Sequence, residues 1–213
     1  MKIVEIFNSI EGEGKRAGLP CTFIRLYGCN LSCSYCDSRY ACEDDKYNVW
    51  SITEIMGAIS QWHTRAVTIT GGEPLIHSGI KDLLKALCDS NYFVNVETNG
   101  TIIPPVRDPH LFYTFDYKCY GSGMSDKMND ELFREHVCSN DVVKFVVSDI
   151  QDLNQVLEVC EKYSLHRNIY VSPVFGKIEP ADIVMYIQDH YLYDWHVQLQ
   201  IHKILWPSDM RGV

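Results

Sequence analysis

Strand-like and helix-like segments alternate along almost the whole chain of 213 residues, and this alternation limits the fold more than any other feature. Apolar, β-branched runs predict strands, and apolar residues at helical spacing predict the helices between them. We expect strands over residues 2–7, 22–27, 66–70, 92–96, 111–115, 142–147, 169–171 and 195–199. We expect helices over residues 52–62, 80–87, 125–137, 150–160 and 180–187. Strands that alternate with helices favour a parallel sheet with helices on its outside.

Three local signals mark where predicted helices begin. Ser51 and Glu54 have the spacing of a capping box, in which each side chain binds the backbone N–H of the other residue. Asp149 is an N-cap residue before the helix at 150–160. Pro180 suits the first turn of a helix, where its missing N–H has no partner to lose.

The number of repeats predicts a particular kind of α/β fold. About six strand–helix repeats follow the first strand, whereas a complete eight-fold barrel usually needs about 250 residues. We therefore predict an incomplete TIM-like barrel of about six repeats, formed by one domain over residues 1–213. In such sheets ligands bind at the carboxyl ends of the strands. Polar turns follow several predicted strands, which places one site at this rim.

Composition and charge exclude several classes of protein. A net charge of −9 disfavours a general nucleic-acid binder. The sequence has no apolar run long enough to span a membrane and no signal-peptide pattern, so we expect a cytoplasmic protein without a membrane partner. Nine cysteines in such a chain favour a reducing compartment and metal binding over disulfides.

Three of the cysteines, Cys29, Cys33 and Cys36, form a C-x3-C-x2-C loop directly after a predicted strand. Three thiolates can hold three irons of a four-iron cluster, and the fourth iron then stays open to a small molecule. A zinc site, with Cys42 or His63 as a further ligand, and inert buried thiols remain alternatives.

A second motif, Thr70-Gly71-Gly72-Glu73-Pro74, follows the next predicted strand. Its two glycines permit a ligand to approach the backbone closely, and Glu73 can accept hydrogen bonds from an ammonium group. Tyr35 before the third cysteine completes a C-x3-C-x-aromatic-C pattern. Together these motifs resemble the radical S-adenosylmethionine (SAM) superfamily, in which the open iron of a 4Fe-4S cluster binds SAM. The resemblance implies SAM contacts from Tyr35, Cys36, Asp37, Gly72, Glu73, Asn99, Ser122, Ser172, Pro173, Val174 and Phe175.

The two ends of the chain narrow the resemblance further. Residues 7–14 contain Gly12-Glu13-Gly14, and the tail contains Gln200-Ile201-His202-Lys203. With the cysteine loop, they resemble the 7-carboxy-7-deazaguanine synthase family, which serves 7-deazapurine (queuosine) biosynthesis. That family contracts the ring of 6-carboxy-5,6,7,8-tetrahydropterin with loss of ammonia. In the family, the radical formed from SAM takes a hydrogen from C6 of the pterin and later returns it. No side chain is expected to be catalytic beyond the cluster and SAM.

The same resemblance implies a substrate site, a metal site and partners. The substrate site would comprise Ile10, Glu11, Gly12, Arg25, Thr70, His202 and Lys203. Glu11 stands where the family more often has glutamine, and it can still accept bonds from the pterin N–H groups. Ser38 matches a Mg2+ position, with Mg2+ also binding the substrate. The implied partners are a flavodoxin or ferredoxin reductant and a second copy of the chain in a homodimer.

Two further enzyme or carrier classes share the cysteine loop. Glycyl-radical-activating enzymes act on a protein partner and also carry C-x3-C-x2-C. An iron–sulfur electron carrier would need no SAM pocket. SAM cleavage together with iron and sulfide analysis separates these alternatives, and also separates the cluster from a zinc domain.

Overall fold

The computed structural model describes residues 1–207 and 210–213, and in this part of the chain nine strands form one sheet. The strands are β1 (Lys2–Ile10), β2 (Pro20–Leu26), β3 (Asn48–Val49), β4 (Ala66–Gly71), β5 (Phe93–Thr98), β6 (Leu111–Tyr117), β7 (Val142–Val147), β8 (Ile169–Pro173) and β9 (Trp195–Val197). Their order across the sheet is β3-β1-β2-β4-β5-β6-β7-β8-β9. All neighbours from β2 to β9 are parallel, whereas β1 pairs antiparallel with β2 and with β3.

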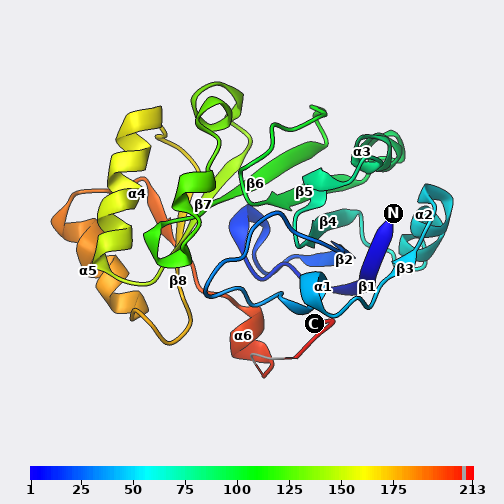
Figure 1. Cartoon of the computed structure of the whole chain (residues 1–213), viewed down its shortest axis with the longest axis horizontal. Coiled ribbons are helices and arrows are strands. Elements are labelled where there is room, and N and C mark those ends of the chain that lie inside the picture. The colour runs from blue at the N-terminus through cyan, green and yellow to red at the C-terminus, as the bar shows by residue number, and fades with distance from the viewer. Residues whose placement is uncertain (208–209) are drawn as a thin grey trace.

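The helices of the described residues are α1 (Tyr40–Glu43), α2 (Ile52–Ile59), α3 (Ile80–Asp89), α4 (Ile150–Tyr163), α5 (Pro180–Asp189) and α6 (His202–Leu205). Figure 1 shows α2 and α3 at one end of the curved sheet and α4 and α5 at the other. The sheet does not close on itself, because β3 and β9 are its two edges. This arrangement confirms the predicted incomplete TIM-like barrel. None of the helices described is long and apolar enough to cross a membrane.

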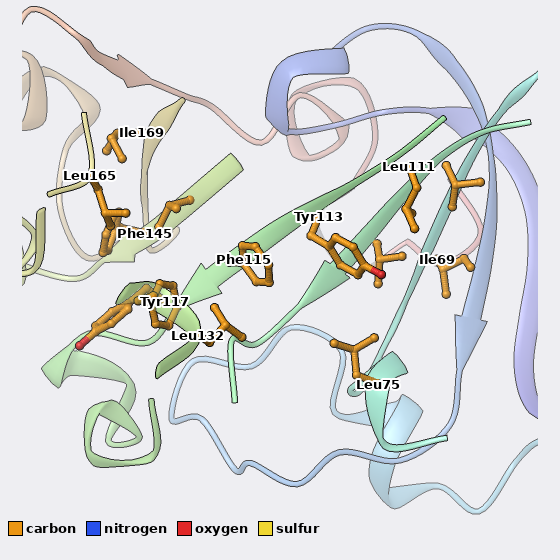
Figure 2. Close-up of a cluster of buried hydrophobic side chains, with 14 of the residues drawn as sticks. Ile69, Leu75, Leu111, Tyr113, Phe115, Tyr117, Leu132, Phe145, Leu165 and Ile169 are labelled. Carbon is orange, nitrogen blue, oxygen red and sulfur yellow. The ribbon is translucent and has the colours of Figure 1, made fainter. Parts of the chain in front are cut away.

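The core lies between the outer face of the sheet and the helices. Alternate strand residues such as Ile69, Tyr113, Phe115 and Phe145 are fully buried there (Figure 2). Residues on the opposite, inner face alternate with them and are mostly polar, because a strand directs successive side chains to opposite faces. The polar inner face is therefore available to bind a ligand.

The predicted helix starts are confirmed. Ser51 accepts a hydrogen bond from the Glu54 N–H, and the Glu54 carboxylate accepts one from the Ser51 N–H, which is the capping box. Asp149 accepts a hydrogen bond from the Asp152 N–H at the start of α4. Pro180 is in the first turn of α5. Apolar spacing and end signals together therefore locate α2, α4 and α5.

The continuous helix predicted for residues 125–137 is wrong. A 3-10 turn covers Ser125–Lys127, and a short π-helix covers Leu132–His136. Met128 is extended between them, and the Asn129 side chain accepts a hydrogen bond from the Leu132 N–H. Asparagine side chains compete in this way for backbone groups and begin a new segment. The last strand is also shorter than predicted, because β9 ends at Val197.

Candidate functional site

The cysteine loop lies at the carboxyl end of β2, as predicted. Backbone hydrogen bonds hold it at both sides, from the Gly28 N–H to the Ala41 carbonyl (2.8 Å) and from the Ser34 N–H to the Ser122 carbonyl (3.0 Å). Burial raises the pKa of the Cys33 thiol, and the nearby Lys118 ammonium opposes that shift. Lys118 opposes the effect of burial at Cys36 in the same way. A cation beside the loop therefore favours the thiolates that a metal requires.

The arrangement of the loop's thiols is compatible with a cluster. Within residues 1–207 and 210–213, no group of three or more His, Cys, Asp or Glu side chains converges as the ligands of one metal ion do. Thiolates that bind different irons of a cluster need not converge on one point. None of the three cysteines forms a disulfide. Besides burial, the charges of Cys36 and Cys29 contribute to the raised pKa of Cys33, so the three thiols lie near one another. Cys42 lies next to Cys29, and burial raises the pKa of its thiol to about 12.

Gly71 and Gly72 pack directly against the chain that leads into the cysteine loop. A Cβ atom on Gly71 would lie 2.2 Å from the Leu26 carbonyl oxygen, and one on Gly72 would lie 2.1 Å from the Gly28 carbonyl oxygen. Gly71 also has a φ of +140°, which side-chain-bearing residues rarely adopt. The structure thus gives the glycines a structural reason, close backbone packing, besides the predicted access for a ligand.

The Glu73 side chain is fully buried, and its carboxylate already accepts three hydrogen bonds. Its carboxylate accepts hydrogen bonds from the Leu75 N–H (2.9 Å), the Thr98 hydroxyl (2.8 Å) and the Asn99 N–H (2.7 Å). Burial raises the pKa of Glu73, and these donors lower it. Glu73 therefore links the turn after β4 to the end of β5, and its contact with the SAM amino group stays a prediction.

Three other predicted SAM contacts touch the cysteine loop or its surroundings. The Asn99 amide donates to the Asn30 side chain (2.9 Å) and lies 3.7 Å from the Cys29 sulfur. The Ser122 carbonyl holds the loop, and its hydroxyl binds the Cys119 carbonyl. The Tyr35 hydroxyl donates to the Val146 carbonyl at the end of β7 (3.1 Å). The fold therefore gathers these residues around the loop.

The end of β8 supplies the remaining predicted SAM contacts. Ser172, Pro173 and Val174 are buried, whereas Phe175 is exposed. The Lys203 ammonium lies 5.9 Å from the centre of the Phe175 ring. Lys203 thus connects this turn with the tail of the chain.

Asp37, just after the cysteine loop, contacts both Lys203 of the tail and its own neighbour Ser38. Lys203 forms an ion pair with Asp37 (3.1 Å), and the Ser38 hydroxyl donates to the other Asp37 oxygen (2.9 Å). Burial would raise the pKa of Asp37, but Lys203 and the Ser38 hydroxyl lower it to about 2. Carboxylate and hydroxyl oxygens are the ligands that Mg2+ accepts in proteins, so this pair fits the ion by ligand type.

The two ends of the chain meet at Gly12. The Ile201 N–H donates to the Gly12 carbonyl (3.1 Å), and a Cβ atom on Gly12 would lie 2.2 Å from Nδ1 of His202. Only glycine leaves room for the His202 ring here. Ile10 ends β1 just before this contact. Segments that are almost 190 residues apart in sequence therefore form one surface.

Glu11 is buried in a network with a cation. Its Oε2 atom accepts hydrogen bonds from Arg16 (2.9 Å) and from the Thr68 hydroxyl (2.5 Å). Arg16 also donates to the Phe93 carbonyl (2.7 Å) at the start of β5. The Arg16 charge offsets the carboxylate that replaces the family's more usual glutamine.

Arg25 lies on the inner face of β2 and binds a carboxylate of the neighbouring strand. Its Nε atom donates to Glu5 (2.7 Å), and the Tyr40 hydroxyl donates to the same Glu5 oxygen (2.8 Å). Neither Nη atom of Arg25 donates a hydrogen bond within the described chain. Glu5 therefore orients Arg25 and leaves its outer nitrogens available to an anion.

Sequence reasoning missed Lys144, which lies deeper in the barrel among charged residues that follow or end neighbouring strands. Lys144 is buried on β7 and pairs with Glu13 (3.0 Å) and Asp116 (3.2 Å). Glu97 on β5 accepts a hydrogen bond from Thr70 (2.9 Å), and burial raises its pKa to about 7, with Lys144 opposing. The signal for Lys144 was a single lysine within the apolar run of residues 142–147. A charge in such a strand is costly unless it is paired at a site.

A pocket of about 470 Å³ lies at the opposite end of the sheet. Its lining includes Ala66, Phe93 and Phe112, which stand at or near the amino ends of β4, β5 and β6. The lining meets the residues described above at Arg16, which contacts Glu11, and at Phe93, whose carbonyl accepts a hydrogen bond from Arg16. The polar rim at the carboxyl ends remains the candidate site.

Comparison with known proteins agrees with this geometry. Residues 23–111 match the radical SAM superfamily. The chain is 42% identical to a 7-carboxy-7-deazaguanine synthase of Clostridium acetobutylicum over 100% of this chain and 99% of the relative. It is 34% identical to a synthase of Chlorobaculum tepidum, over 100% of this chain and 97% of the relative.

Among solved structures, QueE from Escherichia coli superposes with a TM-score of 0.74 at 25% identity and covers 93% of each chain. These relatives favour an enzyme over the electron carrier, and a synthase over a glycyl-radical-activating enzyme. The full-length identity to curated synthases decides between these classes, and the chain belongs to the 7-carboxy-7-deazaguanine synthase family of radical SAM lyases.

Proposed function

We propose that this enzyme converts 6-carboxy-5,6,7,8-tetrahydropterin to 7-carboxy-7-deazaguanine, with loss of ammonia, in 7-deazapurine (queuosine) biosynthesis. The observation that carries the proposal is the contact between the two segments that resemble the family's signatures. Gly12 of the first segment touches Ile201 and His202 of the tail, and the next residue of the tail, Lys203, pairs with Asp37 beside the cysteine loop. A site that uses both ends of the chain explains why the likeness to synthases covers the full length.

Cys29, Cys33 and Cys36 would hold the 4Fe-4S cluster, with SAM on the open iron. When bound, these two groups supply the one-electron chemistry that starts the reaction. The side chains around the cluster and SAM would bind these two groups and orient them relative to the substrate. The proposed SAM site would be surrounded by Gly72, Glu73, Asn99, Ser122 and residues 172–175.

The substrate would lie deeper, against Ile10, Glu11, Gly12, Thr70 and His202. Its carboxylate would bind the free Nη atoms of Arg25, since a guanidinium matches a carboxylate with two parallel bonds. Lys203 would provide a second cation. Ser38, with Asp37 beside it, would hold Mg2+, and the substrate would complete the coordination of that ion.

We also propose the partners of the reaction. A flavodoxin or ferredoxin would donate the electron, and the enzyme would act as a single-domain chain in a homodimer. Sedimentation of the cluster-loaded protein tests the second point, because a monomer at assay concentration would contradict it.

One anaerobic assay tests the proposed function. The cluster-loaded enzyme is incubated with dithionite, SAM, Mg2+ and the carboxy-pterin, and products are separated by mass spectrometry. We expect 7-carboxy-7-deazaguanine and ammonia in equal amounts, with slower turnover after chelation of Mg2+. SAM cleavage without conversion of this pterin would refute the substrate, and absence of SAM cleavage would refute the cofactor assignment.

A further inference from the structure

One buried side chain at the rim has no partner at all. Gln198 follows β9 and is only 6% exposed, yet neither its amide oxygen nor its amide nitrogen has a hydrogen-bond partner in the described chain. The Ser172 hydroxyl at the end of β8 is fully buried and also without a partner. Buried polar groups are nearly always hydrogen-bonded, so such groups require an explanation.

The register of the sheet places these two residues side by side. Val171 of β8 pairs with Val197 of β9, and the Gln198 N–H donates to the Val171 carbonyl (2.9 Å). Ser172 and Gln198 are the next residues on the two strands, and they follow the same alternation of faces. A donor-and-acceptor amide therefore stands next to a hydroxyl at the end of the sheet.

The same row continues to the cysteine loop. Ser172 pairs with Val146 of β7, and the Val146 carbonyl accepts the hydrogen bond of Tyr35, the residue before Cys36. Gln198, Ser172 and the end of the loop thus lie along one edge of the barrel. A ligand bound at a cluster in that loop would therefore share this edge of the barrel with Gln198 and Ser172.

The chemistry of the two side chains defines what would satisfy them. A glutamine amide presents an acceptor and a donor side by side. It pairs with a purine that offers an amino group next to a ring nitrogen, as glutamine does with adenine. A serine hydroxyl can donate or accept and tolerates either neighbour.

We propose that Gln198, assisted by Ser172, binds the edge of the adenine ring of SAM and selects for its 6-amino group. The inference rests on the proposed function, because it assumes SAM at the cysteine loop. The pterin is the less favourable occupant, since the proposed pterin residues Glu11 and Gly12 belong to the network around Arg16 and His202. The Gln198 amide forms no hydrogen bond with either network within the described residues.

The test uses cluster-loaded enzyme, prepared anaerobically, and equilibrium binding of two ligands. One is SAM, and the other is the SAM analogue in which hydrogen replaces the 6-amino group. Gln198→Met keeps a similar length but removes both polar atoms. Gln188→Met on the exposed face of α5 is the matched control.

We expect Gln198→Met to weaken SAM binding on the order of tenfold, as the loss of one or two neutral hydrogen bonds implies. The wild-type enzyme should prefer SAM to the desamino analogue, and the variant should lose most of that preference. This is a chemical double-mutant cycle, which isolates the contact between the amide and the amino group. Gln188→Met should retain both the affinity and the preference.

Thermal unfolding without SAM excludes a merely structural role. Because the amide has no partner in the ligand-free protein, Gln198→Met should not lower the melting temperature. Unchanged SAM affinity, or a retained preference for the 6-amino group, would overturn the proposal. A change confined to the Michaelis constant of the pterin would also overturn it. Failure of the wild-type enzyme to bind SAM would instead contradict the proposed function.

Discussion

Replacing Glu73 should lower the stability of the fold as well as weaken SAM binding. In the folded protein the carboxylate accepts hydrogen bonds from the Leu75 N–H, the Thr98 hydroxyl and the Asn99 N–H, and it is fully buried. Glu73→Ala leaves these three donors without a partner. Each unsatisfied buried group costs about 1–3 kcal/mol, so even the lower value gives roughly 3 kcal/mol in total.

That loss is measurable as a change in melting temperature. For a chain of this size, 1 kcal/mol corresponds to about 2–4 °C, so Glu73→Ala should melt roughly 6–12 °C lower. The assay is thermal unfolding of cluster-loaded protein under anaerobic conditions, with iron content measured before heating. Iron should be retained at low temperature, because the three cysteines are unchanged.

Two variants separate the contributions. Thr98→Val removes only the hydroxyl donor and should cost about 1.5–3 kcal/mol, the value of a hydrogen bond to a charged group. Glu43→Ala, on an exposed side chain of α1, should leave the melting temperature unchanged. If Glu73→Ala melted within about 2 °C of the wild type, the three hydrogen bonds would not stabilise this rim and the reasoning would fail.

Three other predictions concern the same site. The pKa of Glu97 in the folded protein is about 7, above the ordinary glutamate value of 4.5, so its protonated form stabilises the fold below pH 4.5 and that stabilisation is lost as pH rises through 7. Glu97→Gln should flatten this fall in urea unfolding measured at several pH values. Arg25→Ala should raise the Michaelis constant for the pterin by roughly ten- to a hundredfold, as the loss of a charged hydrogen bond implies. Slow substrate-independent SAM cleavage should be retained, and Arg25→Lys should recover part of the affinity. An unchanged Michaelis constant would place the substrate carboxylate elsewhere. Alanine at any cysteine of the C-x3-C-x2-C loop should abolish SAM cleavage, whereas Cys42→Ala should keep both iron and cleavage, and iron loss in Cys42→Ala would indicate a fourth protein ligand.

The sequence predicted the parallel sheet because strand and helix periods are local properties. Continuous apolar runs located strands such as β7, and caps such as Ser51 located helix starts. The region of residues 125–137 failed because the apolar spacing of Leu132 and Phe133 continues across a break that Asn129 makes with its own side chain. Periodicity reports which residues are buried, and both apolar residues are buried as expected.

The partners within the site were less predictable. Motif resemblance placed Gly12 and His202 in one site, and the structure brings them into contact. No spacing rule shows that Glu5, a residue of an antiparallel strand, pairs with Arg25. Such pairs depend on register across strands that are distant in sequence, and one sequence does not contain that register.

Charge balance gives these ion pairs a common consequence for an anionic substrate. Arg25, Lys144 and Lys203 each already pair with a carboxylate, and Glu97 is a further buried carboxylate beside them. A substrate carboxylate would therefore meet cations whose charge is already partly balanced, although the Nη atoms of Arg25 stay available to it. Burying an uncompensated charge is costly, so a divalent ion held at Ser38 would reduce that cost. A proton on Glu97, whose pKa lies near 7, would act in the same direction. We therefore expect Mg2+ to assist substrate binding by balancing the charges of the barrel interior as well as by direct contact with the substrate.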